Sequence, residues 1–172
     1  EYTLFTAQLL TDDQYVTGLK HYIQQFLNNV EYTIEEEEFG VIPMTSARFK
    51  QVDRNIFLIG TAGGQTKASS GFTYMFIQKQ SAMIVEQLKK TGKPFYQLSK
   101  HLQRFSWFDK VLLNVLIKKR VPGDVVFKTM FQKNPIERIF KFLDNESSLV
   151  EDIRLIATLP TKPFLQAGVE EI

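Results

Sequence analysis

Ile56 to Tyr74, IFLIGTAGGQTKASSGFTY, is the stretch that decides the fold expected for this chain of 172 residues. An apolar run, Asn55 to Gly60 (NIFLIG), leads into a loop of small residues, Thr61 to Gly71. The loop in turn leads into an amphipathic helix over Phe72 to Lys90. A continuous apolar run that ends in glycine is typical of a strand buried in a parallel sheet. We therefore expect a central strand, a glycine-rich turn and a helix in succession.

The same loop is a candidate ligand site. Free backbone N–H groups at the start of a helix attract anions, and ligands of open α/β sheets bind at the carboxyl ends of the strands. Gly60, Gly63 and Gly64 let the backbone approach a flat or phosphate-bearing ligand closely. Lys67 is the sole charged residue of the loop. A tight turn without a ligand is an equally common use of such a pattern, so the residues alone leave both interpretations open.

Strand character is also expected on both sides of an N-terminal helix. Glu1 to Ala7 (EYTLFTA) and Tyr32 to Met44 are rich in β-forming residues. Between them, Thr11 followed by two aspartates predicts the start of a helix, and Asn28-Asn29 predicts its end.

Helices are expected to dominate the second half. Beyond Gly92-Lys93-Pro94, at least four short helices are predicted between helix-breaking stretches at 122–123, 134–135, 145–148 and 160–163. The predicted fold is α+β: a few strands with a strand-loop-helix over residues 1–93, then a helical C-terminal region over 94–172, together one continuous globular unit.

Composition excludes several classes of function. The net charge of +2 is too small to indicate nucleic-acid binding, and the absence of cysteine excludes disulfides and thiolate metal sites. His21 and His101 lie in no ligand-spaced cluster, so no metal is expected. The longest apolar run, Val111 to Ile117, is too short to cross a bilayer. The chain has fifteen Phe, six Tyr and one Trp, which suits either a large hydrophobic core or a hydrophobic ligand.

Two further stretches contain acidic residues in specific contexts. Glu38 to Met44 reads EFGVIPM, and it follows a run of glutamates in which strand alternation places Glu36 and Glu38 on one face. The chain opens with Glu1-Tyr2-Thr3. The plain interpretation is that Pro43 ends an edge strand, that the glutamates are solvated and that Glu1 is a frayed terminus.

These three motifs, in this order, resemble the lycopene cyclase family of flavoproteins. IGTAGGQTKASSGF is similar to the family's second flavin-binding segment, Glu38 to Met44 matches E-x-x-V-I-P-M, and Glu1-Tyr2-Thr3 aligns with a strand whose first glutamate acts as acid/base in the family. Two departures stand out. Lys67-Ala68 occupies the place of the family's His-Pro, and Thr61 the place of an aspartate that related hydroxylases carry near the ribityl chain.

The resemblance implies an enzyme that converts linear lycopene into a cyclic carotenoid by acid-initiated cyclisation, an isomerase (intramolecular lyase) reaction without net redox. It implies reduced FAD as cofactor, with Glu1 and Glu38 as catalytic residues. The implied flavin-binding residues are those of the loop and the start of the following helix: Gly60, Thr61, Ala62, Gly63, Gly64, Ser70 and Gly71.

The G-x-G-x-x-G turn that binds the ADP half of FAD is not among the glycines of this sequence. We therefore expect the chain to be the C-terminal part of such an enzyme and to be inactive by itself. Two alternatives remain open: a related flavoprotein oxidoreductase acting on an isoprenoid or aromatic substrate, and a non-catalytic module that binds a membrane or a partner.

A cytoplasmic location with peripheral membrane contact is the expected setting. Basic and aromatic residues are interleaved between Lys100 and Lys110 and are followed by a basic cluster at 118–120. Such a pattern suits a helix at a membrane surface, and it equally suits an amphipathic helix with a basic solvent face.

Overall fold

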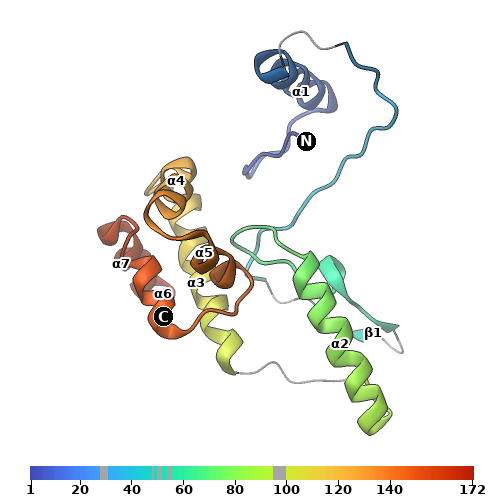
Figure 1. Ribbon diagram of the computed structural model, residues 1–172, viewed down its shortest axis with the longest axis vertical. Helices are drawn as coiled ribbons and strands as arrows, with labels where there is room; N and C mark the ends of the chain where they lie inside the picture. Colours follow the sequence, from blue (N-terminus) through green and yellow to red (C-terminus); the bar gives the residue numbers. More distant parts are fainter. Residues whose placement is uncertain (28–30, 48, 50–51, 54–55, 95–99) are drawn as a thin grey trace. The chain divides into compact units, whose positions relative to one another are not determined.

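The computed structural model describes the chain apart from residues 28–30, 48, 50–51, 54–55 and 95–99 (Figure 1). The chain separates into two compact units, Glu1–Gly40 and Val41–Ile172. Residue 93, where the sequence changes character, lies inside the second unit.

The first unit is built around one helix, α1 (Asp12–Leu27). Thr11 begins it: the Thr11 carbonyl accepts the N–H groups of Gln14 and Tyr15, and two aspartates occupy the first turn. The predicted N-terminal helix is thus confirmed, whereas its predicted stop at Asn28-Asn29 lies outside the described residues. α1 buries no residue fully, and the Tyr15 ring packs between those of Tyr2 and Phe39, with centroids 6.4 and 5.4 Å away.

The strands predicted for residues 1–7 and 32–44 are wrong. Both segments run without regular secondary structure in the described chain. An extended segment becomes a strand only when a neighbouring strand satisfies its N–H and C=O groups, and neither segment pairs with one here.

The second unit opens with two strands of two residues each, β1 (Val52–Asp53) and β2 (Ile56–Phe57). They pair antiparallel, with Val52 opposite Phe57. The predicted buried parallel strand is therefore wrong, and its apolar residues are open to solvent: Ile56 is 63% exposed and Ile59 47%. A short apolar run reports burial poorly when no periodicity accompanies it.

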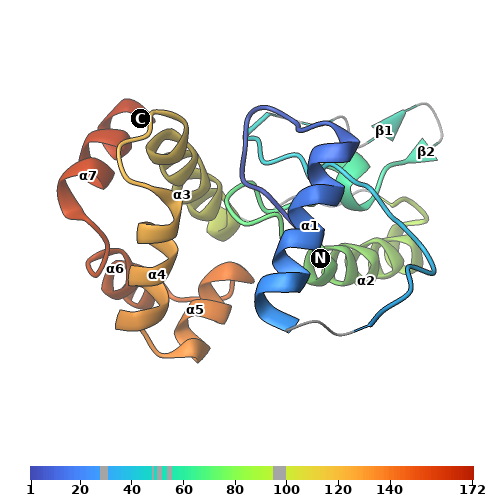
Figure 2. The same ribbon diagram turned by 90° about the horizontal axis from the view of Figure 1, so that it is seen from above.

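Helices account for most of the described structure, so the α+β prediction is contradicted. After the 3₁₀ turn η1 (Gly60–Gly63) comes α2 (Tyr74–Thr91), which confirms the helix predicted there and ends at Gly92 in the left-handed conformation. The expected short helices of the second half are also confirmed, as α3 (Lys100–Ile117), α4 (Gly123–Lys133), α5 (Ile136–Leu143), α6 (Leu149–Ile156) and α7 (Thr161–Glu170) (Figure 2).

The hydrophobic core lies among α3 to α7. Val115, Ile139 and Leu155 are almost fully buried within it, together with Val126. α3 contributes Val111 and Val115, and in the stretch that suggested membrane contact it packs Phe105, 0% exposed, inside the protein. In the described residues no helix combines the length and apolarity that a bilayer crossing requires.

Ion pairs join the helices at the edge of this core. Arg104 on α3 bonds through Nε to Asp152 on α6 at 2.8 Å, and its guanidinium donates to the Ser147 carbonyl. At the far end of α3, Glu170 on α7 accepts from Lys118 and Arg120, each at 2.6 Å. These bonds hold α6 and α7 to α3.

Acidification is expected to loosen α7. The hydrogen bond from Lys118, followed by those from Arg120 and Asn114, lowers the pKa of Glu170 from 4.5 to about 2. A carboxylate with a depressed folded-state pKa stabilises the fold above its unfolded pKa, and this contribution is lost as pH falls through the folded value. The melting temperature should therefore drop between about pH 4.5 and 2, and Glu170→Gln should drop less over the same range. Equal slopes for both proteins in calorimetry would contradict this assignment.

Candidate functional site

The glycine-rich segment is a tight turn with a fixed backbone path. Gly63 N–H donates to the Ile59 carbonyl at 3.3 Å, and Gln65 N–H donates to the Gly60 carbonyl at 2.8 Å. A Cβ on Gly63 would lie 2.2 Å from the Leu58 carbonyl oxygen, and Gly64 has φ +76°. The turn therefore requires glycine at both positions.

A second turn closes the segment before α2. Lys67 N–H donates to the Phe72 carbonyl at 2.8 Å, and the Lys67 carbonyl accepts from Ser70 and Gly71 at 3.2 and 2.8 Å. Gly71 has φ +75°. Between Gly60 and Gly71, the chain thus folds into two consecutive hydrogen-bonded turns rather than a sheet-to-helix crossover.

Three threonine hydroxyls tie the two turns together. Thr73 donates to Thr66 at 3.1 Å, and Thr66 donates to Thr61 at 3.2 Å. The resemblance had placed Thr61 beside the cofactor in the position of an acidic residue. The Thr61 hydroxyl accepts a hydrogen bond from Thr66, and its place beside a cofactor stays a prediction.

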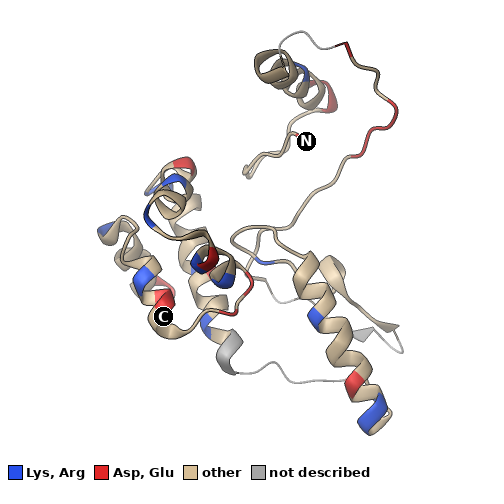
Figure 3. Ribbon diagram, viewed as in Figure 1, with Lys and Arg blue, Asp and Glu red and all other residues tan. Residues whose placement is uncertain are grey.

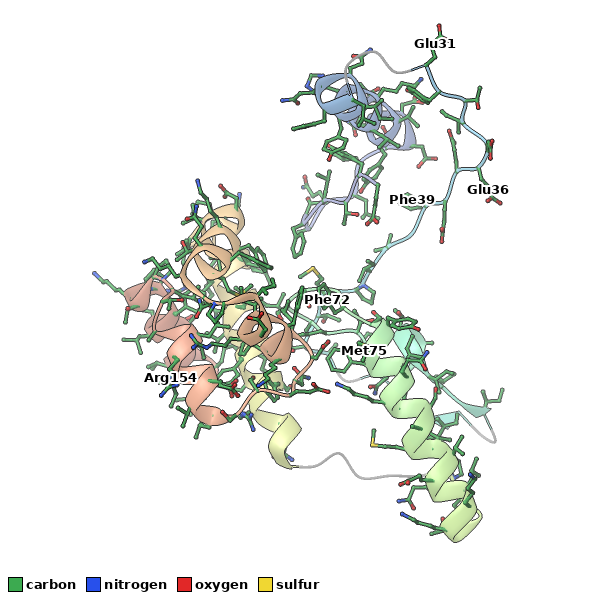
Figure 4. The ribbon with its side chains drawn as sticks, in the orientation of Figure 1. Glu31, Glu36, Phe39, Phe72, Met75 and Arg154 are labelled. Atoms are coloured by element: carbon green, nitrogen blue, oxygen red, sulfur yellow. The ribbon has the colours of Figure 1, made fainter. Side chains whose placement is uncertain are left out.

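The start of α2 carries no competing negative group. Its N-cap, Thr73, makes no side-chain capping bond, and the first turn of α2 contains no acidic residue. Phe72, Tyr74 and Met75 surround this helix start and are 44%, 72% and 42% exposed; Figure 4 shows Phe72 and Met75 at the entry to α2. Uncapped N–H groups beside exposed apolar side chains suit a flat ligand with negative charge.

Gln80 on α2 is hydrogen-bonded to the start of the loop. Its side chain is fully buried on α2, and its Oε1 accepts the Gly60 N–H at 3.4 Å. Its Nε2 finds no hydrogen-bond partner among the described residues. A buried amide whose NH₂ group has no acceptor is costly, and nothing in the sequence pattern predicted the contact with Gly60.

Lys67 does not present its charge to the surface. Its side chain is 0% exposed, and its ammonium pairs with Asp109 on α3 and bonds to Asn145 between α5 and α6. Sequence reasoning missed both partners. A signal existed, because a lysine placed among small residues in a tight loop must find a carboxylate if its side chain turns inward.

The two candidate catalytic glutamates belong to the first unit. Glu1 accepts the Thr3 hydroxyl at 2.5 Å. Glu38 ends the acidic run, which follows an irregular path (Figure 3). Both side chains are exposed. The candidate flavin-binding residues all belong to the second unit, so the prediction that Glu1 faces them stays a prediction.

No cluster of metal-ligating residues occurs in the described part of the chain.

Comparison with known proteins gives one positive result. No curated protein and no solved structure matches the sequence. The family model described as "Lycopene cyclase protein" matches residues 1–168. With nearly its whole length covered by that model, the chain belongs to the lycopene cyclase family.

Proposed function

We propose that the protein takes part in the acid-initiated cyclisation of lycopene, with reduced FAD as cofactor and the segment from Gly60 to Gly71 as part of the flavin site. The family match over residues 1–168 carries the proposal, because it ties the chain to carotenoid cyclisation. The flavin and the mechanism rest on the resemblance of the glycine-rich motif and on the chemistry of the loop.

The loop residues fit a flavin in three respects. Gly64 and Gly71 have positive φ and no side chain of their own, with the side chains of Phe49 and Ile42 packed close to them. The first turn of α2 offers N–H groups with neither a capping side chain nor an acidic neighbour. Phe72 and Met75 supply exposed apolar surface beside them. Together these features favour a planar ring whose polar edge carries negative charge.

The reaction requires one proton to be added and another to be removed. A carboxylic acid adds its proton to the terminal double bond, the carbocation closes a six-membered ring, and a proton leaves to form the ring double bond. Glu1 is the proposed acid, and Glu38 the proposed carboxylate that stabilises the cation, because the reaction needs one group that donates a proton and another that carries negative charge. When bound, the reduced flavin would supply negative charge that stabilises a carbocation.

The proposed flavin site can be tested with a matched pair of glycine variants in the full-length protein. Gly64 and Gly92 have φ +76° and +70°, so valine is strained to a similar degree at either site. Gly64→Val should abolish the flavin absorbance of the purified protein and its lycopene cyclisation, because a side chain at this position would force the proposed flavin-binding loop to shift against Phe49. Gly92→Val, at the end of α2, should retain both.

Gly64 differs from Gly92 in one respect: its Cβ would approach the Phe49 side chain to 2.9 Å, whereas that of Gly92 meets nothing. Circular dichroism therefore accompanies the assay, to establish that Gly64→Val is folded. Flavin binding and cyclisation at the wild-type level in a folded Gly64→Val protein would remove the loop from the site. Net oxidation of the flavin on each turnover would replace cyclisation by an oxidoreductase reaction.

A further inference from the structure

The loop from Gly60 to Gly71 is anchored to distant helices by a single buried cation. Lys67 Nζ lies 2.9 Å from Asp109 Oδ1 and 2.8 Å from Asn145 Oδ1. The same ammonium lies 5.6 Å from the ring centres of both Phe105 and Phe142. Figures 1 and 2 show this segment beside the ribbon of α3. One lysine thus joins the loop to α3, to α5 and to the connection between α5 and α6.

Asp109 holds the loop at a second point. The oxygen that pairs with Lys67 also accepts the Ser69 hydroxyl at 2.5 Å. As whole residues, Lys67 and Ser69 are each 3% exposed, and the side chain of Asp109 is 10% exposed. A carboxylate that serves two residues of the same turn fixes their separation and orientation, and not merely their distance from α3.

The backbone of Lys67 links its ion pair with Asp109 to the start of α2. Lys67 is hydrogen-bonded through its N–H to Phe72 and through its carbonyl to Ser70 and Gly71. Moving the Lys67 side chain therefore displaces the turn that delivers the first N–H groups of α2.

The connection between α5 and α6 anchors α2 independently. Lys79 on α2 pairs with Glu146 at 2.7 Å and donates to the Asp144 carbonyl at 3.1 Å. Asn145, which accepts a hydrogen bond from the Lys67 ammonium, adopts the left-handed conformation at φ 58°. Asparagine adopts this conformation more readily than most non-glycine residues, which suits a position just after the end of α5.

We propose that Lys67 and Asp109 are positioning residues for the flavin site, through which the helical region α3 to α6 sets the shape of the loop. The inference rests on the proposed function, since it assigns the loop a flavin. A buried ion pair is poor evidence for stability as such, because apolar residues of similar size often serve the fold equally well. The role of this pair is to hold Ser69, Ser70 and Gly71 in the geometry that meets the cofactor.

The test separates positioning from folding by removing both charges at once. Lys67→Met or Asp109→Leu alone leaves one buried charge without its partner. Each single variant should therefore lower the melting temperature of the full-length protein and its affinity for FAD. The double variant Lys67→Met/Asp109→Leu should regain a melting temperature close to wild type. It should nevertheless bind FAD about tenfold more weakly and alter the visible circular dichroism of the bound flavin.

A second ion pair on the same helix provides the control. Arg104 and Asp152 link α3 to α6, with the Asp152 side chain fully buried and that of Arg104 22% exposed. Arg104→Met/Asp152→Leu should leave the FAD dissociation constant and the flavin spectrum of the full-length protein unchanged. FAD binding equal to wild type in a folded Lys67→Met/Asp109→Leu protein would overturn the proposal.

A milder substitution keeps the proposal falsifiable if the double variant fails to fold. Ser69→Ala removes one anchor and leaves the Lys67–Asp109 pair intact, and it should raise the FAD dissociation constant by about 2- to 10-fold, the range of a single net hydrogen bond. Ser106→Ala, at an exposed position of α3, should not change it. Indistinguishable results for Ser69→Ala and Ser106→Ala would reject the positioning role. Absence of FAD binding by the wild-type full-length protein would reject the proposed function itself.

Discussion

Replacing Glu1 by Gln is expected to lower lycopene cyclisation by about 100-fold or more while leaving FAD bound, which is the loss typical of a removed general acid. The amide of glutamine preserves the size of the side chain but cannot donate a proton to an alkene. The measurement is turnover in the full-length protein supplied with reduced flavin, with bound flavin quantified by absorbance.

Another acid of the first unit supplies the control. Glu37 precedes Glu38 and is also exposed, but it carries no proposed role. Glu37→Gln should cyclise lycopene at the wild-type rate. Near wild-type turnover in Glu1→Gln would exclude Glu1 as the proton donor, and its bond to the Thr3 hydroxyl would then be a local contact only.

Local sequence signals predicted the helices well. Thr11 with its two aspartates begins α1, Gly92 ends α2, and the predicted helix-breaking stretches at 122–123, 134–135, 145–148 and 160–163 separate α3 to α7. Each signal acts through bonds within a few residues of itself, since caps and breakers act on the nearest backbone groups. Such features are determined by local chemistry and can be read from one sequence.

The strands failed because sheet formation is not local. NIFLIG resembles a buried strand by composition, yet only Ile56 and Phe57 are paired in β2, and the partner is the adjacent β1. Whether an apolar run is buried depends on what covers it, and that information lies elsewhere in a fold. The resemblance to an α/β flavoprotein reinforced the strand prediction and did not correct it.

The sequence predicted a glycine turn at Gly63 and Gly64 but not the contacts that support it, and the ligand of this turn stays a prediction. The glycines at 63 and 64 do form a turn that requires glycine, as the motif suggested. Asp109 and Asn145, which bind the Lys67 ammonium, lie 42 and 78 residues beyond Lys67 in the sequence. Pairing a buried lysine with its carboxylate at such a separation requires the tertiary arrangement, which no spacing rule supplies.

Phe105→Ala is expected to destabilise the protein by about 3–5 kcal/mol, the range for truncation of a fully buried phenylalanine. Phe105 is 0% exposed, and its ring contacts those of Phe108 and Phe142 at centroid distances of 6.2 and 6.0 Å. Its removal would leave a cavity between α3 and α5. Urea denaturation of the purified protein measures the loss as a lower transition midpoint with an unchanged slope.

Phe131 on α4 is the matched control, because its side chain is 47% exposed. Phe131→Ala should change the free energy of unfolding by only about 0.5 kcal/mol, the usual range for a surface substitution. Phe105 also lies beneath the Lys67 ammonium, so Phe105→Ala should weaken FAD binding together with stability, whereas Phe131→Ala should affect neither. An equal and small loss of stability in both variants would show that Phe105 is not part of the core.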